Sequence, residues 1–298
     1  MRDAGQDDAA IEESLDPADW EAARDLVVRV AGEAVDHLHA VPSRPVWRDM
    51  PPDIRAGLAT PLPEGPTALE NVVREVFDTA MAYPMGNTHP RFWSWYMGAG
   101  NLTGVLAEFL AAVQGSNLGG GNHAAACMDD QVAGWLKEMV GFPAEASGTL
   151  TSGGSEANLV GLTVARNVMA GVDVRAEGIA AAPRPLRFYA FDQVHGCHLK
   201  AVEGLGLGRK ALRLIPTGGD FRIDLAALRV AIAEDRAAGL KPACIIGTAG
   251  TVNAGQRSRL IAARRVPPHP LEHRADDPPM RETDRDHVGA AECVVHAD

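Results

Sequence analysis

The amino-acid sequence predicts an α/β fold with a mostly parallel, doubly wound sheet. From residue 148 onward, short apolar runs of strand length alternate with longer runs of helical period. The expected strands are residues 148–150, 187–191, 211–215 and 243–248, and the expected helices between them are residues 155–169, about 196–204 and 224–238. Because a helix separates each strand from the next, the connections are crossovers, which align neighbouring strands in parallel.

The sequence before residue 148 is predicted to be mainly helical. Apolar residues recur at three- and four-residue spacings in most of the expected helices, which are residues 17–39, 68–81, 102–114 and 129–140. Residues 102–114 are apolar on all sides, which favours a buried helix. Seven prolines between residues 42 and 66 predict an extended arm across another surface.

The composition excludes several classes of function. The chain has 298 residues, of which 46% are hydrophobic and 22% charged, as in ordinary globular proteins. A formal net charge of −11 argues against a nucleic-acid partner. No apolar run is long enough to span a membrane, and the acidic residues 1–16 are unlike a signal peptide, so a cytoplasmic protein is expected. The four cysteines are widely separated, which predicts reduced thiols and no metal site.

The most informative segment is residues 151–155, Thr-Ser-Gly-Gly-Ser, between an apolar run and a helix. Glycines allow a close backbone approach, and the first turn of a helix has N–H groups without partners. Gly153, Gly154 and Ser155 are therefore predicted to bind an anion, most often phosphate. The segment has neither the lysine of a P-loop nor the third glycine of a dinucleotide motif. The alternative is a tight turn capped by a serine.

Two further polar clusters follow expected strands, so they should meet residues 151–155 at one edge of the sheet. His195 follows residues 187–191, and its ring can stack on a heteroaromatic cofactor or transfer a proton. Thr251 follows residues 243–248 and can offer a hydroxyl to the same ligand. The alternatives are a helix-capping or surface histidine and a simple strand exit.

Four aromatic residues gather within five positions in a chain that has only 5% aromatic residues: Phe92, Trp93, Trp95 and Tyr96. Packing in a core or at a subunit interface is one interpretation. The wall of a substrate pocket for an aromatic or apolar side chain is the other.

Residues from about 86 to 255 resemble the group II pyridoxal-phosphate-dependent decarboxylases, which include aromatic amino acid, glutamate and histidine decarboxylases. The matching stretches are His89-Pro90-Arg91-Phe92, Gly153-Gly154-Ser155-Glu156-Ala157-Asn158, Asp192-Gln193-Val194-His195 and Gly247-Thr248-Ala249-Gly250-Thr251. The resemblance implies a fold-type-I PLP-dependent transferase-like architecture, a pyridoxal 5'-phosphate cofactor, an amino-acid substrate and a homodimer. The domains expected from it are a tail at 1–16, a helical dimerisation arm at 17–85, a partial PLP-binding large domain at 86–255 and an irregular tail at 256–298.

The resemblance also implies roles for individual residues. Gly153, Gly154 and Ser155 would hold the cofactor phosphate, and Thr251 would contact the cofactor. His195 would stack on the pyridine ring as the catalytic histidine. Members of the family remove the α-carboxyl group of an amino acid, so the expected activity is that of a carboxy-lyase.

The sequence departs from the family pattern after Gly255. The family uses an aspartate in an H-x-D motif and a Schiff-base lysine, but this chain has no lysine after Lys241. His296-Ala297-Asp298 imitates the H-x-D motif, and the composition of residues 256–298 suggests a frameshift. We therefore expect an incomplete large domain and a truncated, inactive enzyme. Other fold-type-I activities (aminotransferase or carbon–sulfur lyase) and a non-catalytic remnant that binds a phosphate ligand or a paralogue are the alternatives.

Overall fold

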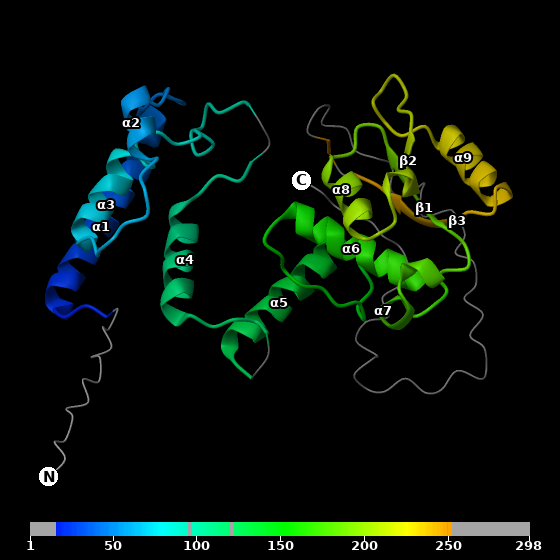
Figure 1. Cartoon of the computed structure of the whole chain (residues 1–298), viewed down its shortest axis with the longest axis horizontal. Coiled ribbons are helices and arrows are strands. Elements are labelled where there is room, and N and C mark those ends of the chain that lie inside the picture. The colour runs from blue at the N-terminus through cyan, green and yellow to red at the C-terminus, as the bar shows by residue number, and fades with distance from the viewer. Residues whose placement is uncertain (1–15, 95–96, 120–121, 249, 252–298) are drawn as a thin grey trace, which may run out of the picture. The chain divides into compact units, whose positions relative to one another are not determined.

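The computed structural model describes residues 16–94, 97–119, 122–248 and 250–251 (Figure 1). It divides into two compact units, Met1–Gly115 and Ser116–Asp298. The expected domain limits remain predictions, and the tail at 256–298 lies outside the described residues. No helix among those residues is long and apolar enough to cross a membrane.

The first unit is helical in its regular parts. Its elements are α1 (Trp20–Ala40), η1 (Val41–Ser43), α2 (Pro52–Gly57), α3 (Leu69–Asp78) and α4 (Leu102–Gln114). Asp19 caps α1, because its carboxylate accepts hydrogen bonds from the N–H groups of Glu21 and Ala22, both at 3.0 Å. The proline-rich stretch is only partly extended: η1 and α2 each carry a proline in the first turn, where its missing N–H costs no hydrogen bond.

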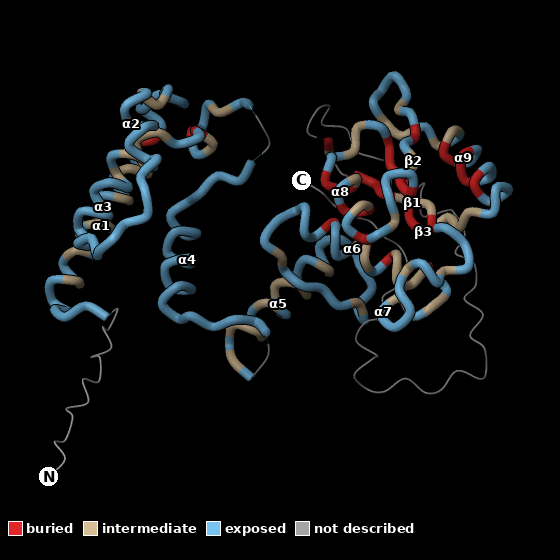
Figure 2. Tube along the Cα trace, in the orientation of Figure 1, coloured by how far each residue is buried: buried red, intermediate tan, exposed pale blue. Residues whose placement is uncertain are grey.

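Helix α4 contradicts the prediction of a buried helix. None of its residues is buried, and Leu110 and Val113 are 64% and 72% exposed. A helix that is apolar on all sides needs neighbours on all sides to be buried. The other helices of the first unit do not surround α4, as Figure 2 shows.

The second unit contains the sheet. Its elements are α5 (Ala124–Met139), α6 (Gly154–Met169), α7 (Val174–Glu177), η2 (Ile179–Ala181), β1 (Leu186–Phe191), α8 (Cys197–Gly204), η3 (Arg209–Ala211), β2 (Leu212–Ile215), α9 (Leu225–Ala237) and β3 (Lys241–Ile246). The strand order is β2-β1-β3, and β1 pairs in parallel with both neighbours. Side chains of α6 and α8 cover one face of the sheet and those of α9 cover the other, so the doubly wound α/β prediction is confirmed.

The core follows from the two-residue period of the central strand. Phe188 and Ala190 point to the face covered by α6 and α8, where they join a cluster with Leu162. Tyr189 points to the opposite face and packs with Leu228 of α9. Figure 2 shows the buried residues concentrated around the strands.

Polar groups also fasten α9 to the sheet. Asp235 of α9 is 5% exposed and forms ion pairs with Arg213 of β2 at 2.9 Å and Arg187 of β1 at 3.4 Å. Burial and the nearby Asp235 raise the pKa of Tyr189, so its hydroxyl stays neutral. Two arginines therefore compensate one carboxylate between the helix and two strands, as a buried charge requires.

The expected strand at residues 148–150 is absent. This segment has no regular structure, and Leu150 is 48% exposed. A strand is stable only when a neighbour satisfies its backbone hydrogen bonds. No strand among the described residues pairs with this segment, so its apolar character alone does not make it a strand.

We predict that the central strand dominates the stability of the second unit. Phe188→Ala should lower the free energy of unfolding by about 3–5 kcal/mol, because it leaves a cavity between β1 and the helices. Leu214→Ala is the matched control: Leu214 lies on β2 but is 53% exposed. Urea unfolding followed by circular dichroism measures both, and similar losses in the two variants would contradict the described core.

Candidate functional site

The N-terminus of α6 carries the predicted anion-binding residues. Gly153 is its N-cap, and the Gly153 carbonyl accepts hydrogen bonds from the N–H groups of Glu156 at 3.1 Å and Ala157 at 3.0 Å. Gly154 and Ser155 precede these bonds, so their N–H groups point out of the helix end. Both residues are exposed, and no atom lies within 4 Å of the position that a Cβ on Gly153 would take. The helix end is open to a ligand.

Two hydrogen bonds between Ser152 and Glu156, which we call the latch, lie at this helix end. Glu156 accepts hydrogen bonds from the Ser152 backbone N–H at 2.9 Å and from the Ser152 hydroxyl at 2.5 Å. The hydroxyl bond, followed by the backbone bond, lowers the pKa of Glu156, so the carboxylate is ionised at neutral pH. These two bonds of Glu156 go to Ser152, and the N–H groups of Gly154 and Ser155 stay available to an external anion.

His195 lies between the end of β1 and the start of α8. Its Nδ1 accepts a hydrogen bond from the Cys197 backbone N–H at 3.2 Å, so the proton of the neutral ring is on Nε2. The His195 residue is exposed. The structure is thus compatible with a helix-capping histidine and with a histidine that stacks on a cofactor. The ring accepts a hydrogen bond at the start of α8 through Nδ1, and it remains accessible.

A buried contact joins α6 to α8. The Asn158 side-chain amide donates to Cys197 Sγ at 3.3 Å, and Asn158 and Cys197 are 0% and 6% exposed. Asn158 lies about 6 Å along the axis from Gly154, and Cys197 is two residues from His195. The structure therefore brings the open end of α6 and His195 to the same edge of the sheet.

A second contact fixes the backbone of His195. Nδ1 of His198 lies 3.0 Å from the His195 carbonyl oxygen and 3.6 Å from Cys197 Sγ. His198 is fully buried. Asn158, Cys197 and His198 cannot be assigned to the site from the sequence, because their contacts depend on how α6 and α8 pack. The only indication of these contacts in the sequence was a polar residue on the expected buried face of each helix.

The strand ends complete this edge. The Asp192 backbone N–H donates to the Ile215 carbonyl at 3.0 Å, and Asp192 Oδ2 accepts from the Thr217 N–H at 3.3 Å, so the ends of β1 and β2 are tied together. Thr248 and Thr251 follow β3 and are 6% and 7% exposed. Because β3 pairs in parallel with β1, these threonines follow the strand end beside Asp192.

The aromatic cluster is described only in part. Trp93 belongs to the first unit and is 90% exposed, which contradicts the interpretation that this side chain packs in a core. Trp95 and Tyr96 lie outside the described residues. A place in a substrate pocket or an interface therefore stays a prediction.

The chain's four lysines all lie within the described residues. Lys137 Nζ donates to two carbonyl oxygens, those of Ala144 at 2.6 Å and Ala146 at 2.8 Å. Lys210 precedes β2, and Lys241 begins β3, so both belong to the amino ends of strands. Lys200 is exposed on α8, whose buried side is formed by other residues. None lies in the loops beyond the carboxyl ends of the strands.

Comparison with known families identifies one match. Residues 51–261 match the pyridoxal-dependent decarboxylase conserved domain. An aromatic-L-amino-acid decarboxylase of Bacillus atrophaeus is 32% identical over 240 residues, which cover 79% of this chain and 48% of the relative. The aromatic-L-amino-acid decarboxylase of Rattus norvegicus is 30% identical over 244 residues, 76% of this chain and 49% of the relative. The chain thus spans about half the length of these relatives.

Solved structures show the same fold. The glutamate decarboxylase domain of a Vibrio parahaemolyticus protein, diaminobutyrate-pyruvate transaminase and L-2,4-diaminobutyrate decarboxylase, has a TM-score of 0.71 at 24% identity over 80% of this chain and 55% of that one. Oryza sativa TDC, solved with PLP and tryptamine, has a TM-score of 0.70 at 22% identity over 84% and 54%. The fold-type-I architecture predicted from the sequence is therefore confirmed. Together with the conserved-domain match over most of its length, this fold shows that the chain belongs to the pyridoxal-dependent decarboxylase family.

Proposed function

We propose that this chain binds pyridoxal 5'-phosphate at the carboxyl edge of the sheet. The observation that carries the proposal is the open N-terminus of α6, held beside His195 by the buried contact between Asn158 and Cys197. Backbone N–H groups and the positive end of the helix dipole suit a phosphate group. An exposed histidine ring nearby suits a flat heteroaromatic ring.

The proposed roles follow the chemistry of each group. The N–H groups of Gly153, Gly154 and Ser155, with the Ser155 hydroxyl, bind the phosphate. His195 stacks its ring on the cofactor while its Nδ1 keeps the cap on α8. Thr251 donates its hydroxyl to the cofactor. The bound cofactor supplies an electron sink for the carbon that loses carboxylate.

For the complete enzyme we propose decarboxylation of an amino acid by a cytoplasmic homodimer. The family match and the relatives named for aromatic amino-acid decarboxylation support this assignment. The 298 residues would then be the N-terminal part of such an enzyme, with residues 17–85 as its dimerisation arm.

We further propose that these 298 residues alone have little or no turnover. Members of the family hold the cofactor covalently through a lysine, and the positions of all four lysines support its absence here. Lys137 is engaged by carbonyl groups, Lys210 and Lys241 belong to the amino ends of strands, and Lys200 is on the exposed side of α8. The cofactor would bind through its phosphate and ring only.

Cofactor binding to this chain should be non-covalent. The cofactor should bind reversibly, and borohydride treatment should leave it separable from the protein on denaturation, because no lysine reaches its aldehyde. Absorption spectroscopy, followed by peptide mapping, tests this. A cofactor-labelled peptide containing Lys200 would overturn the proposal of non-covalent binding.

Ser155 and His195 should each contribute to cofactor binding. Ser155→Ala and His195→Asn should each weaken cofactor binding about three- to tenfold in equilibrium dialysis, since each removes one favourable contact. Asparagine can still accept the bond from the Cys197 N–H, so His195→Asn tests the ring and not the cap. Thr163→Ala is the control, because it removes a hydroxyl from the middle of α6. An equal effect of all three variants would count against the proposed site.

The latch between Ser152 and Glu156 should set the ionisation of the Glu156 carboxyl group. Ser152→Ala should raise the pKa of Glu156 toward its ordinary value, because the hydroxyl bond is the main cause of the lowered pKa. The sign follows from the ionised form: the latch holds at neutral pH and is lost as the pH falls through the lowered pKa of Glu156. A carboxyl-carbon NMR titration measures the change, with Thr149→Ala as the control. An unchanged Glu156 pKa in Ser152→Ala would refute the latch.

A further inference from the structure

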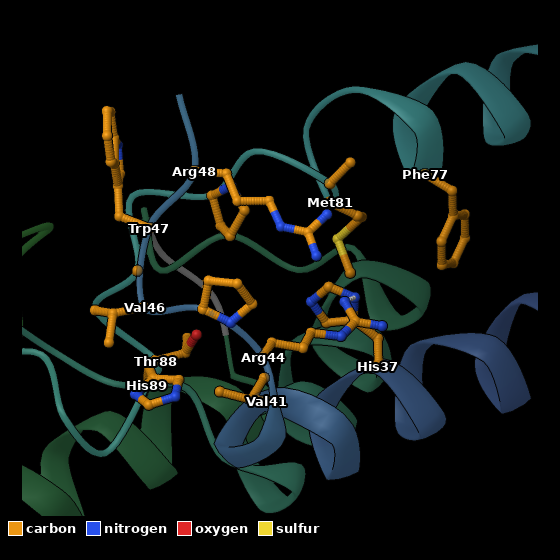
Figure 3. A pocket seen from close by; sticks show the side chains of 14 residues that line it. His37, Val41, Arg44, Val46, Trp47, Arg48, Phe77, Met81, Thr88 and His89 are labelled. Carbon is orange, nitrogen blue, oxygen red and sulfur yellow. Dashed lines mark hydrogen bonds between the residues drawn. The ribbon is translucent and has the colours of Figure 1, made fainter. Parts of the chain in front are cut away.

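The first unit contains a cavity of its own, with a volume of about 340 Å³. Its walls come from the end of α1, the segment at residues 44–48, the end of α3 and the segment at residues 81–89 (Figure 3). This volume lies in the range of pockets that bind small organic molecules. None of the residues assigned to the proposed cofactor site lines it.

The lining carries positive charge without compensation. Arg44 and Arg48 line the cavity, and no aspartate or glutamate does. Among the described residues neither arginine forms an ion pair, whereas Arg29 in the same unit pairs with Glu70 at 2.9 Å. In Figure 3 the Arg48 side chain extends toward Met81. Two guanidinium groups thus share one cavity with no carboxylate.

His37 adds a polar contact but no charge of its own. Arg44 Nη1 lies 2.6 Å from His37 Nδ1, and an arginine can only donate, so Nδ1 accepts. Burial, and after it the charge of Arg44, lowers the pKa of His37, which keeps the ring neutral at neutral pH. The His37 contact orients the Arg44 guanidinium without neutralising it.

The walls of the cavity are held in place by a close backbone approach. Gly86 has a φ of +94°, and a Cβ there would lie 2.1 Å from the Val46 carbonyl oxygen. Only glycine suits this position, which fixes the segment at 81–89 against the segment at 44–48. Such a preformed cavity binds a ligand without first paying to order its walls.

His89 contributes a polar side chain to the lining of the cavity. It is 4% exposed, and its Nδ1 accepts from the Arg91 N–H at 3.0 Å, so Nε2 carries the proton. Nε2 is buried without a hydrogen-bond partner among the described residues. Because an unsatisfied buried donor is costly, an acceptor oxygen beside it would be stabilising. Phe77 and Met81 supply apolar lining elsewhere in the cavity.

We propose that this cavity binds a small organic anion, a carboxylate attached to an apolar body. The arginines would hold the carboxylate, since their planar forks match its two oxygens. Phe77, Met81 and the neighbouring prolines would contact the apolar body. The absence of acidic residues from the lining selects against amines and against amino acids, whose ammonium group would meet only positive charge.

The test uses phenylacetate as the probe with the full chain, at constant ionic strength and neutral pH. Saturation-transfer NMR titrations should show a dissociation constant of about 1 mM or lower, which is within reach of a ligand of about ten non-hydrogen atoms. Phenylacetamide has the same shape without the charge and should bind at least about tenfold more weakly. Phenethylamine should not bind. Equal binding of the acid and the amide, or no saturable binding of phenylacetate, would overturn the proposal.

Matched variants locate the binding. Arg44→Gln and Arg48→Gln should each weaken phenylacetate binding about five- to tenfold, the loss of one charge-assisted hydrogen bond. Arg48→Lys should retain part of the affinity, because it keeps the charge but loses the fork. Arg29→Gln removes an arginine of the same unit that lies outside the cavity and should change nothing. If Arg29→Gln weakens binding as much as the cavity variants, the probe binds by general charge and the proposed site is wrong.

Discussion

The central strand β1 has neighbours on both edges and helices over both faces, and the rest of the second unit depends on this constraint. Phe188 and Tyr189 point in opposite directions, and both are fully buried. Along the strands, the charged side chains Arg187 and Arg213 are engaged by Asp235 of α9. The polar groups of the candidate site lie at the strand ends, where Asp192 ties β1 to β2 and Thr248 and Thr251 follow β3.

The helices bring the other half of the site to this edge. The open end of α6 supplies backbone N–H groups, and the segment between β1 and α8 supplies His195. Asn158 and Cys197 connect the two, although 39 residues separate them in the sequence. Removal of this contact would leave both helix ends intact but would no longer fix one against the other.

The local parts of this arrangement could be predicted from the sequence. Hydrophobic period placed β1 and α6 within one residue of their observed starts, and the glycine segment marked the start of α6. The same reasoning failed for residues 148–150 and for α4. An apolar run needs a partner to become a strand, and an apolar helix needs neighbours to be buried. Hydrophobic period and composition do not show whether a strand has a partner or whether a helix has neighbours.

The contacts that define the two candidate sites could not be predicted from hydrophobic period either, because they also depend on which segments pack together. Asn158, Cys197 and His198 meet through helix packing, and Arg44 approaches His37 because the chain turns between them. Gly86 is also informative only in three dimensions, since the atom that it avoids belongs to Val46. Residue type indicated what these side chains can do, and packing decided what they contact.

Cofactor binding and covalent chemistry make different demands on this fold. A phosphate cup needs one helix end, whose donors are backbone groups formed as soon as α6 folds. A covalent link needs a lysine at the same edge of the sheet, and distance excludes Lys241 from this role. Lys241 begins β3, which runs to Ile246, so about 16 Å of strand separates it from the edge that holds His195. That separation is far longer than a lysine side chain. A helix end of this kind can recognise a phosphate group whether or not a lysine bonds to the same ligand.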